Sequence, residues 1–203
     1  MTLVTRWLAV AFLLLSAYLA WDHFVLARPI ERGPGAIAGH APLQGVVDDA
    51  TPVLAKEDFR LTPLATFAME ARVIRSERYC CNASARLAPI DVVFGWGRMS
   101  DEAVLARIDI NQSGRFYYWR YEGLAPISRR EIETSSANMH LIAATPMIEK
   151  RIQSLRSGNL VTLKGYLVEV NGPGDFRWRS SLTREDTGDG ACEVIWVESL
   201  EVS

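Results

Sequence analysis

The longest apolar stretch of the chain lies near its N-terminus. Residues 7–21 (WLAVAFLLLSAYLAW) carry no charge, Asp22 and His23 interrupt the pattern, and apolar residues continue to Ala27. As a helix the uncharged run spans roughly 22 Å, and the whole stretch to Ala27 spans roughly 31 Å, against a bilayer core of roughly 30 Å. The pattern predicts an N-terminal transmembrane helix within residues 1–27.

Two other interpretations of this segment remain open. A single basic residue, Arg6, before a short apolar core is also typical of a cleaved signal peptide, although Pro29 closely follows the site at residues 25–27. A buried helix of the domain is the third interpretation. We favour the uncleaved anchor because no clean small-residue cleavage motif is present.

The orientation of the anchor is less clearly encoded. Arg6 precedes the apolar run, whereas Arg28 and Arg32 follow it, so the positive-inside count opposes export of the C-terminal domain. A very short N-terminal tail nonetheless usually stays inside. We therefore expect a single-pass membrane protein whose C-terminal domain is exported.

The remaining chain divides into a linker and one domain. Residues 28–63 interleave Pro, Gly and Ala with scattered charge and show no sustained apolar period, so they are predicted to be a flexible linker. Residues 64–203 have the ordinary length of a single domain with its own core.

The domain is predicted to be mostly β. Alternating apolar positions, aromatic content and turn signals between them predict strands at residues 67–73, 115–121, 139–142, 159–170, 176–182 and 191–202. Residues 82–98 are predicted to be a loop. Gly165 lies in the middle of the strand at residues 159–170, where a bend or bulge is expected.

One helix has clear start and stop signals in the sequence. Thr145 is a suitable N-cap, Pro146 suits the first turn, and Ile148 and Ile152 lie on one face before Gly158. A mostly β domain with one helix before a long, glycine-bent strand resembles an OB-type barrel. The fold class expected is therefore α+β, mainly β, with an OB-like small barrel and an alternative α+β barrel or sandwich.

Four segments, FGWGRMSD, DINQSGRFYYWRY, SSANMHLI and WRSSLTREDTGDGACE, occur in this order behind the N-terminal segment. In this they resemble a group of bacterial membrane-anchored proteins of uncharacterised activity. The resemblance implies a bacterial inner-membrane location, with the exported domain in the periplasm. In that location the sequons at Asn82 and Asn111 are expected to carry no glycan. It implies no reaction.

Composition and motifs exclude several classes of function. The formal net charge of −2 gives no global electrostatic footprint for nucleic acid, which stays an alternative only for a cytoplasmic domain. The chain lacks GxxxxGK[ST], GxGxxG, HExxH, GxSxG and an EF-hand loop. No cofactor is expected.

Three cysteines leave the thiol chemistry open. Cys80 and Cys81 are neighbours, whose mutual bond would be strained, so a disulfide Cys81–Cys192 or Cys80–Cys192 is one interpretation. Three reduced thiols are the other. Zinc is not expected because CxxC spacing and nearby histidines are missing.

A polar group precedes the strand at residues 139–142. In an extended chain Ser136, Asn138 and His140 share one face, so a hydroxyl, an amide and a base can converge on a small ligand. These three residues are the catalytic candidates. The alternative is a polar turn with a structural His140.

Aromatic and basic residues alternate in two predicted strands. Tyr117 and Trp119 in the first, with Arg177 and Arg179 in the second, are candidates for ligand binding on a barrel face. Trp96, between two glycines, is either a further binding residue or a plug at the end of the core. No metal is expected, because the carboxylates of residues 184–190 match no calcium loop and equally suit a hairpin turn.

These observations predict a noncatalytic module that binds an envelope protein or glycan, or assembles a larger complex. A small envelope hydrolase using His140 with Ser136, Asn138 and Arg179 is the alternative.

Overall fold

The computed structural model describes the backbone of residues 3–186, 188 and 190–203, and within the first helix it describes the side chains of residues 6–18. The side chains of residues 19–27 in the predicted anchor therefore lie outside the described residues. The elements in chain order are α1 (Leu3–Ala27), β1 (Leu43–Gly45), β2 (Leu54–Lys56), β3 (Phe59–Arg78), α2 (Ala83–Leu87), β4 (Ile90–Gly95), the 3₁₀ helix η1 (Gly97–Ser100), α3 (Glu102–Leu105), β5 (Asp109–Ser113), β6 (Phe116–Arg120), α4 (Arg129–Thr134), β7 (Ser136–Ala143), α5 (Pro146–Gln153), β8 (Leu160–Asn171), β9 (Arg177–Arg179) and β10 (Glu193–Val202).

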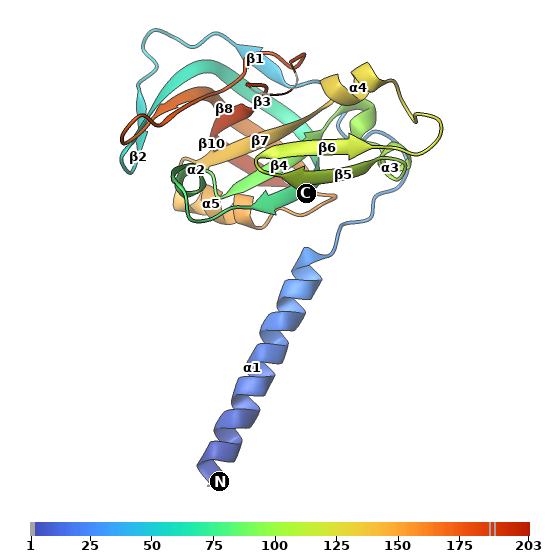
Figure 1. Cartoon of the computed structure of the whole chain (residues 1–203), viewed down its shortest axis with the longest axis vertical. Helices are drawn as coiled ribbons and strands as arrows, with labels where there is room; N and C mark the ends of the chain where they lie inside the picture. Colours follow the sequence, from blue (N-terminus) through green and yellow to red (C-terminus); the bar gives the residue numbers. More distant parts are fainter. Residues whose placement is uncertain (1–2, 187, 189) are drawn as a thin grey trace.

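The domain is mainly β and is built on one large mixed sheet (Figure 1). Within that sheet a ring of pairings closes on itself: β3 pairs with β4, β4 with β7, β7 with β10, β10 with β8, and β8 again with β3. In this ring β7 and β10 run parallel, and the other four pairs are antiparallel. Closure gives each ring strand a partner on both sides, which protects its edges.

Strand β3 is the long strand that pairs with both β4 and β8 and so closes the ring. Its buried positions alternate from Phe59 to Ala71, as a strand with one face toward a core requires. Residues 60–72 pair with β8, whereas residues 72–78 pair with β4, so one strand borders both neighbours in turn. The predicted strand at residues 67–73 is the middle of this longer element.

Three clusters of buried residues pack around the ring. Alternate residues of β7 and β10 point into the main core, and the residues between them point outward. The inward members include Ala137, Met139, Leu141, Ile195 and Val197. A second cluster contains Ile142, Val194 and Trp196, and a third, beneath the β5–β6 hairpin, contains Val93, Ile110 and Ile132.

The loop predicted at residues 82–98 is instead a short helix, α2, and the ring strand β4. All of β4 is buried, because Val92 and Phe94 face the main core while Val93 faces the cluster under the hairpin. A strand covered on both faces has no alternation of apolar and polar residues. Strand β4 is apolar except for Asp91, so its sequence shows no two-residue period.

Helix α5 matches its sequence signals. The Thr145 hydroxyl accepts a hydrogen bond from the Ile148 backbone N–H at 3.3 Å, Pro146 begins the first turn, and Ile148 and Ile152 are buried. The helix crosses between β7 and β8 and packs against β7 and β10.

Gly165 allows β8 to approach β10 closely. A Cβ atom on Gly165 would lie 1.8 Å from the Trp196 carbonyl oxygen, so no side chain fits there. The ladder between these strands changes register between Val197 and Ser199, opposite this glycine. The predicted irregularity at Gly165 thus marks a close backbone approach between two ring strands.

Of residues 28–63, predicted to be a flexible linker, residues 59–63 begin strand β3 and residues 28–58 run along the domain. Ile30 donates its backbone N–H to the Ser157 carbonyl at 2.8 Å, Ala38 is fully buried, and the Ala38 carbonyl accepts the Gly97 N–H at 2.7 Å. Gly158, with φ +90°, makes room for Ile30, whose carbonyl oxygen would lie 2.0 Å from an added Cβ. Strands β1 and β2 then pair with β3.

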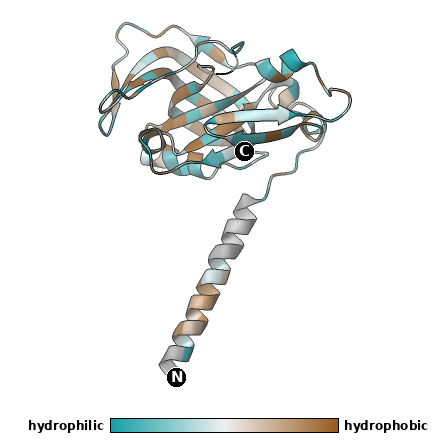
Figure 2. Cartoon of the chain, viewed as in Figure 1, coloured by the Kyte–Doolittle hydropathy of each residue, from teal (hydrophilic) through white to brown (hydrophobic). Residues whose placement is uncertain are grey.

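Helix α1 stands away from this domain, and its described apolar part is visible in Figure 2. The large apolar side chains described in it are 45–69% exposed: Trp7, Leu8, Val10, Phe12, Leu13, Leu14, Leu15 and Tyr18. Among the described residues, no helix combines the length and apolar character required to cross a bilayer.

Candidate ligand-binding site

The β5–β6 hairpin carries an arginine at its tip. Its two-residue turn, Gly114–Arg115, has φ values of +60° and +73°, as a type I′ hairpin turn requires. Glycine adopts this conformation readily, whereas Arg115 does so only when other contacts hold it. Those contacts connect the hairpin tip to the outer wall of the ring.

Arg115 is held through both its backbone and its side chain. Its N–H donates to the Tyr79 hydroxyl at 3.1 Å, and its carbonyl accepts a hydrogen bond from the Asn138 amide at 2.8 Å. The guanidinium lies over the Tyr79 ring at 4.1 Å and near the Trp178 ring at 5.4 Å. It also donates to the Ala88 carbonyl at 2.9 Å.

The side chain of Arg115 ends on a buried carboxylate. Its Nη1 lies 2.6 Å from Asp91 Oδ1, and the same oxygen lies 2.7 Å from His140 Nδ1. Neither Asp91 nor His140 has exposed surface, and the imidazole packs against Trp178 with ring centroids 4.6 Å apart. We call Asp91, Arg115, His140 and Trp178 the buried arginine cluster. A buried charge of this kind is tolerated only because it is paired.

A cavity of about 430 Å³ lies beside this cluster. Strands β7 and β10 are parallel and begin at its edge, so their first residues reach the same end of the ring of strands. Hairpin strand β6, helix α4 and the segment before β10 supply the other walls. The lining side chains combine aromatic, charged and amide groups, among them Arg115, Tyr117, Trp119, Asn138, Arg184 and Glu193.

The most buried charged group of the cavity is Glu193. Its side chain is 3% exposed, and its Oε1 lies 3.0 Å from Arg184 Nε. Burial raises the pKa of Glu193 to about 7, although the neighbouring Arg184 guanidinium acts in the opposite direction. Its second oxygen, Oε2, has no hydrogen-bond partner among the described residues. Glu193 Oε2 is therefore a buried acceptor without a described partner, on a carboxyl group in the cavity wall whose pKa is near neutral pH.

The three residues proposed for catalysis do share one face of β7, as predicted, but they bond to different groups. Ser136 donates to the Ile132 carbonyl at 2.7 Å, and the Tyr117 hydroxyl lies 3.3 Å from the Ser136 oxygens. The Asn138 amide oxygen accepts from Gln112 at 2.8 Å, while His140 contacts Asp91. Ser136 and Asn138 line the cavity, whereas His140 lies beneath the surface with no exposed area.

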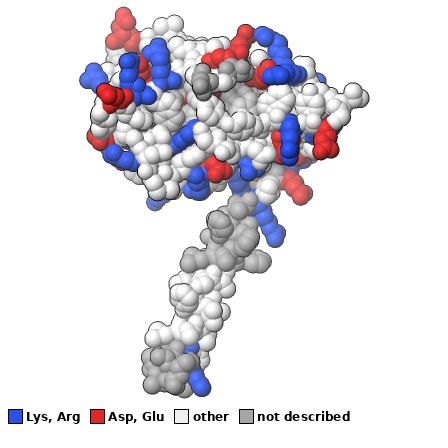
Figure 3. Space-filling model, in the orientation of Figure 1, with Lys and Arg blue, Asp and Glu red and all other residues white. Residues whose placement is uncertain are grey.

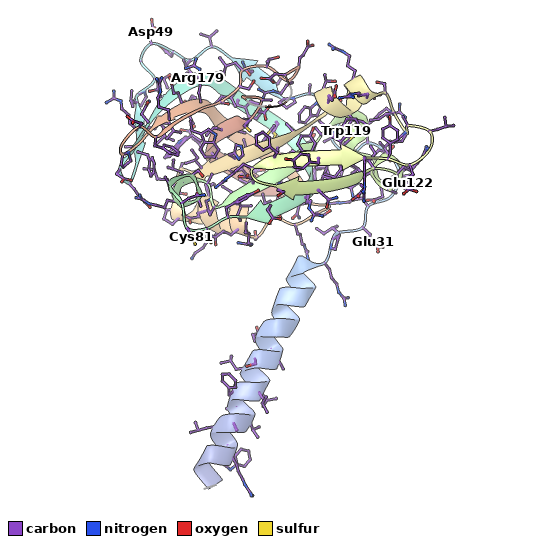
Figure 4. The ribbon with its side chains drawn as sticks, viewed as in Figure 1. Glu31, Asp49, Cys81, Trp119, Glu122 and Arg179 are labelled. Carbon is purple, nitrogen blue, oxygen red and sulfur yellow. The ribbon has the colours of Figure 1, made fainter. Side chains whose placement is uncertain are left out.

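The predicted binding residues separate into three places. Tyr117 and Trp119 line the cavity, and burial raises the pKa of the Tyr117 hydroxyl. Arg177 and Arg179 are exposed on β9, where each pairs with Glu169, and Arg179 is separate from Trp119 in Figure 4. Trp96 is 3% exposed and belongs to the main core, as its alternative interpretation had it.

The loop at residues 184–190 contributes to the cavity through Arg184, Asp186 and Gly188. Asp186 accepts a hydrogen bond from the Ser181 hydroxyl at 2.6 Å. Thr187 and Asp189 of this segment lie outside the described residues.

Sequence reasoning missed the two buried carboxylates, Asp91 and Glu193. Asp91 is the one charged residue of the otherwise apolar strand β4 (IDVVFG), and Glu193 begins β10 directly before the apolar run VIWV. A charge in such a run is buried with its strand and therefore needs a partner. The sequence therefore contains this signal. The partner of Asp91, Arg115, comes from the separate β5–β6 hairpin, whereas Arg184 lies in the connection that leads directly to Glu193.

Comparison of the chain with protein-family models, with curated proteins and with solved structures finds no match in any of the three.

Proposed function

We propose that this chain is a tethered binding module of the bacterial envelope: an OB-type barrel, held at the inner membrane by its N-terminal segment, that binds an envelope protein or glycan. The observation that carries the proposal is the cavity at the barrel end, with aromatic walls and the Glu193–Arg184 pair.

The OB-type assignment is supported by the order of pairings. Five strands form the ring, and α5 lies between its third and fourth members, β7 and β8. OB-type barrels bind ligands on the face of their second and third strands and with the loop between the fourth and fifth. The cavity is bordered by β7 and by residues 184–192, which belong to the connection between β8 and β10.

The chemistry of the cavity supports recognition of a small polar group. Its volume of about 430 Å³ falls within the roughly 300–1,000 Å³ of ordinary ligand sites. Aromatic side chains provide flat apolar contacts, and a few polar groups orient the ligand. Positive and negative side chains alternate over the visible face of the domain (Figure 3), so the surface does not resemble the basic stripe of a nucleic-acid-binding protein.

The hydrolase interpretation draws no support from this geometry. A general base must come within hydrogen-bond reach of the proton that it removes. His140 has no exposed surface and faces Asp91 and Trp178, and the Ser136 hydroxyl donates to a backbone carbonyl. We therefore assign both residues to the support of the site.

Binding is tested by filling the cavity. Ala191 lines it, and Ala191→Trp adds a large side chain there without removing any charged or hydrogen-bonding group. Protein comprising residues 28–203 is immobilised and exposed to solubilised envelope proteins and to isolated cell-wall glycan. A specific ligand is retained by the wild type and by Leu124→Trp, a control at an 85% exposed site outside the cavity, but is lost with Ala191→Trp. Equal retention by all three proteins, or by none, contradicts the proposal.

The tether is tested separately with vesicles of phosphatidylethanolamine and phosphatidylglycerol. The exposed apolar residues of α1 support insertion, and each charge at a helix centre costs about 2.5–3.5 kcal/mol. The full chain should float with vesicles, Leu13→Arg/Leu14→Arg should not, and Leu43→Arg on β1 should float normally. Unchanged flotation of the double variant contradicts the anchor. Active C-terminal alkaline phosphatase fusions then support a periplasmic domain, and inactive fusions contradict it.

A further inference from the structure

We infer that Cys80 and Cys81 form an oxidisable dithiol site that reacts with organic disulfides and closes to a disulfide between the two neighbouring residues. This inference does not depend on the proposed ligand or on the membrane tether.

The geometry of the backbone brings the two thiols together. In an extended chain successive side chains point to opposite faces, so neighbouring thiols lie apart. Cys81 has φ +75°, a left-handed conformation that a non-glycine residue adopts rarely. The turn at this residue places both sulfurs on the same side, and the Cys81 and Cys80 Sγ atoms lie 2.6 Å apart, inside the contact distance of two sulfur atoms.

Residues on both sides hold this arrangement. The Tyr79 N–H donates to the Pro89 carbonyl at 2.8 Å, and its hydroxyl accepts the Arg115 N–H at 3.1 Å. On the other side, the Asn82 side chain accepts the Ala85 N–H at 2.8 Å and caps α2. The two cysteines are thus fixed between anchored neighbours, which gives each thiol a high effective concentration near the other.

The site is also accessible. Both cysteines are exposed, and Cys81 lies at the edge of the domain beside α2 (Figure 4). A strained, exposed disulfide is readily reduced, so the pair can exchange in both directions. Cys81 already has its left-handed φ with both thiols reduced, so ring closure does not have to create that conformation.

The reaction with glutathione disulfide proceeds in two exchanges. One cysteine thiolate attacks the disulfide, forms a mixed disulfide and releases one glutathione thiolate. The second cysteine loses its proton, attacks the mixed disulfide at the protein sulfur and releases the other glutathione thiolate. Overall, two cysteine thiols are oxidised by two electrons, and glutathione disulfide is reduced to two glutathione molecules.

The experiment uses the reduced full-length protein, which is incubated with glutathione disulfide, blocked with N-ethylmaleimide and digested with trypsin. Arg78 and Arg86 place both neighbouring cysteines in one peptide, residues 79–86, whereas Cys192 falls in residues 185–203. We expect peptide 79–86 to become lighter by two hydrogen atoms, to carry no maleimide and to regain both thiols with dithiothreitol. Cys192→Ser should behave identically.

The single variants provide the control for ring closure. Cys80→Ser and Cys81→Ser each keep one thiol of the pair and should stop at the glutathione adduct. Three results overturn the inference in the wild type: a cross-link between peptides 79–86 and 185–203, a persistent glutathione adduct on peptide 79–86, or two thiols that remain available to maleimide.

Discussion

Asp91 has two cationic or polar partners and no contact with solvent. On the outer side of the ring, Asp91 Oδ1 accepts a hydrogen bond from Arg115 Nη1 at 2.6 Å. The same oxygen lies 2.7 Å from His140 Nδ1. The carboxylate therefore joins three segments of the chain: β4, the tip of the β5–β6 hairpin, and β7. At the residue scale, Asp91 neutralises the positive charge of the Arg115 guanidinium, which the hairpin places against the outer side of the ring.

Asp91→Asn keeps the shape of the side chain but leaves Arg115 without its counter-charge. We expect a loss of about 3 kcal/mol in the free energy of unfolding, the size typical when one partner of a buried pair is removed. Urea denaturation measures it. The matched control is Asp109→Asn, whose pair with Arg120 has side chains 47% and 81% exposed and should contribute no more than about 1 kcal/mol. Equal losses for the two variants contradict a buried role for Asp91.

Glu193 makes stability depend on pH in a defined direction. Its pKa is about 7 in the folded chain and about 4.5 when unfolded, so the folded state binds the proton more tightly. This stabilisation is complete below the unfolded pKa and disappears as the pH rises through 7. Relative to Glu193→Gln, the wild type should lose about 2–3 kcal/mol of unfolding free energy between pH 5 and pH 8.

The control for Glu193→Gln is Glu169→Gln, because the pKa of Glu169 is shifted in the opposite direction and stability should therefore depend on pH with the opposite sign. Arg177 and Arg179 lower the pKa of Glu169, so its contribution is present above its ordinary pKa and is lost as the pH falls. Urea denaturation at several pH values distinguishes the two glutamates. A difference between wild type and Glu193→Gln that is constant with pH contradicts the assignment.

At the scale of elements, the pairing of β8 with β10 depends on Gly165, because a residue with a side chain would not fit at this position. Gly165→Ala places a methyl group where the Trp196 carbonyl oxygen lies, and both are parts of ring strands that cannot separate without losing hydrogen bonds. We expect destabilisation of about 1–3 kcal/mol, the cost of forcing atoms into a filled space. Amide hydrogen exchange should become faster in β8 and β10.

Gly39→Ala is the matched control for this substitution. A Cβ at Gly39 meets nothing within 4 Å, so its effect should stay within about 0.5 kcal/mol. Unchanged exchange in Gly165→Ala would show that β10 can move away without cost, and would contradict the close approach described above.

At the scale of the whole molecule, residues 28–58 join the domain to its N-terminal helix. Arg32 Nη2 donates to the Ser203 carbonyl at 2.8 Å, so this segment also contacts the end of the chain. The Ser100 hydroxyl accepts the N–H groups of Ile37 and Ala38 at 3.1 Å. These contacts indicate that the segment is part of the folded domain.

Shortening the chain tests this. Protein that begins at residue 28 should melt at a higher temperature than protein that begins at residue 59, which lacks β1, β2 and the buried Ala38. A loss of about 2 kcal/mol corresponds to a decrease of roughly 4–8 °C for a domain of this size. Calorimetry on both proteins gives the answer, and identical melting temperatures would mean that residues 28–58 are a free tether.

The sequence by itself determined the features that depend on local physics. Helix α5, with its Thr145 cap and Pro146, follows from hydrogen bonds and dihedral angles within a few residues. The alternation of β3 and β6 and the shared face of Ser136, Asn138 and His140 follow from the two-residue period of a strand. The mainly β character of the domain follows from several such strands.

The tertiary structure decided what depends on distant partners. Strand β4 has no alternation because both its faces are covered, and the segment at residues 28–58 has no period because its contacts are made by backbone groups and single side chains. Asp91 and Glu193 are recognisable as charges in or beside apolar runs. The role of Asp91 depends on Arg115, which the β5–β6 hairpin brings to it, and the role of Glu193 depends on how the preceding loop places Arg184. Ring closure decides which strands border the cavity, because β7 and β10 become neighbours only when the last strand joins the sheet.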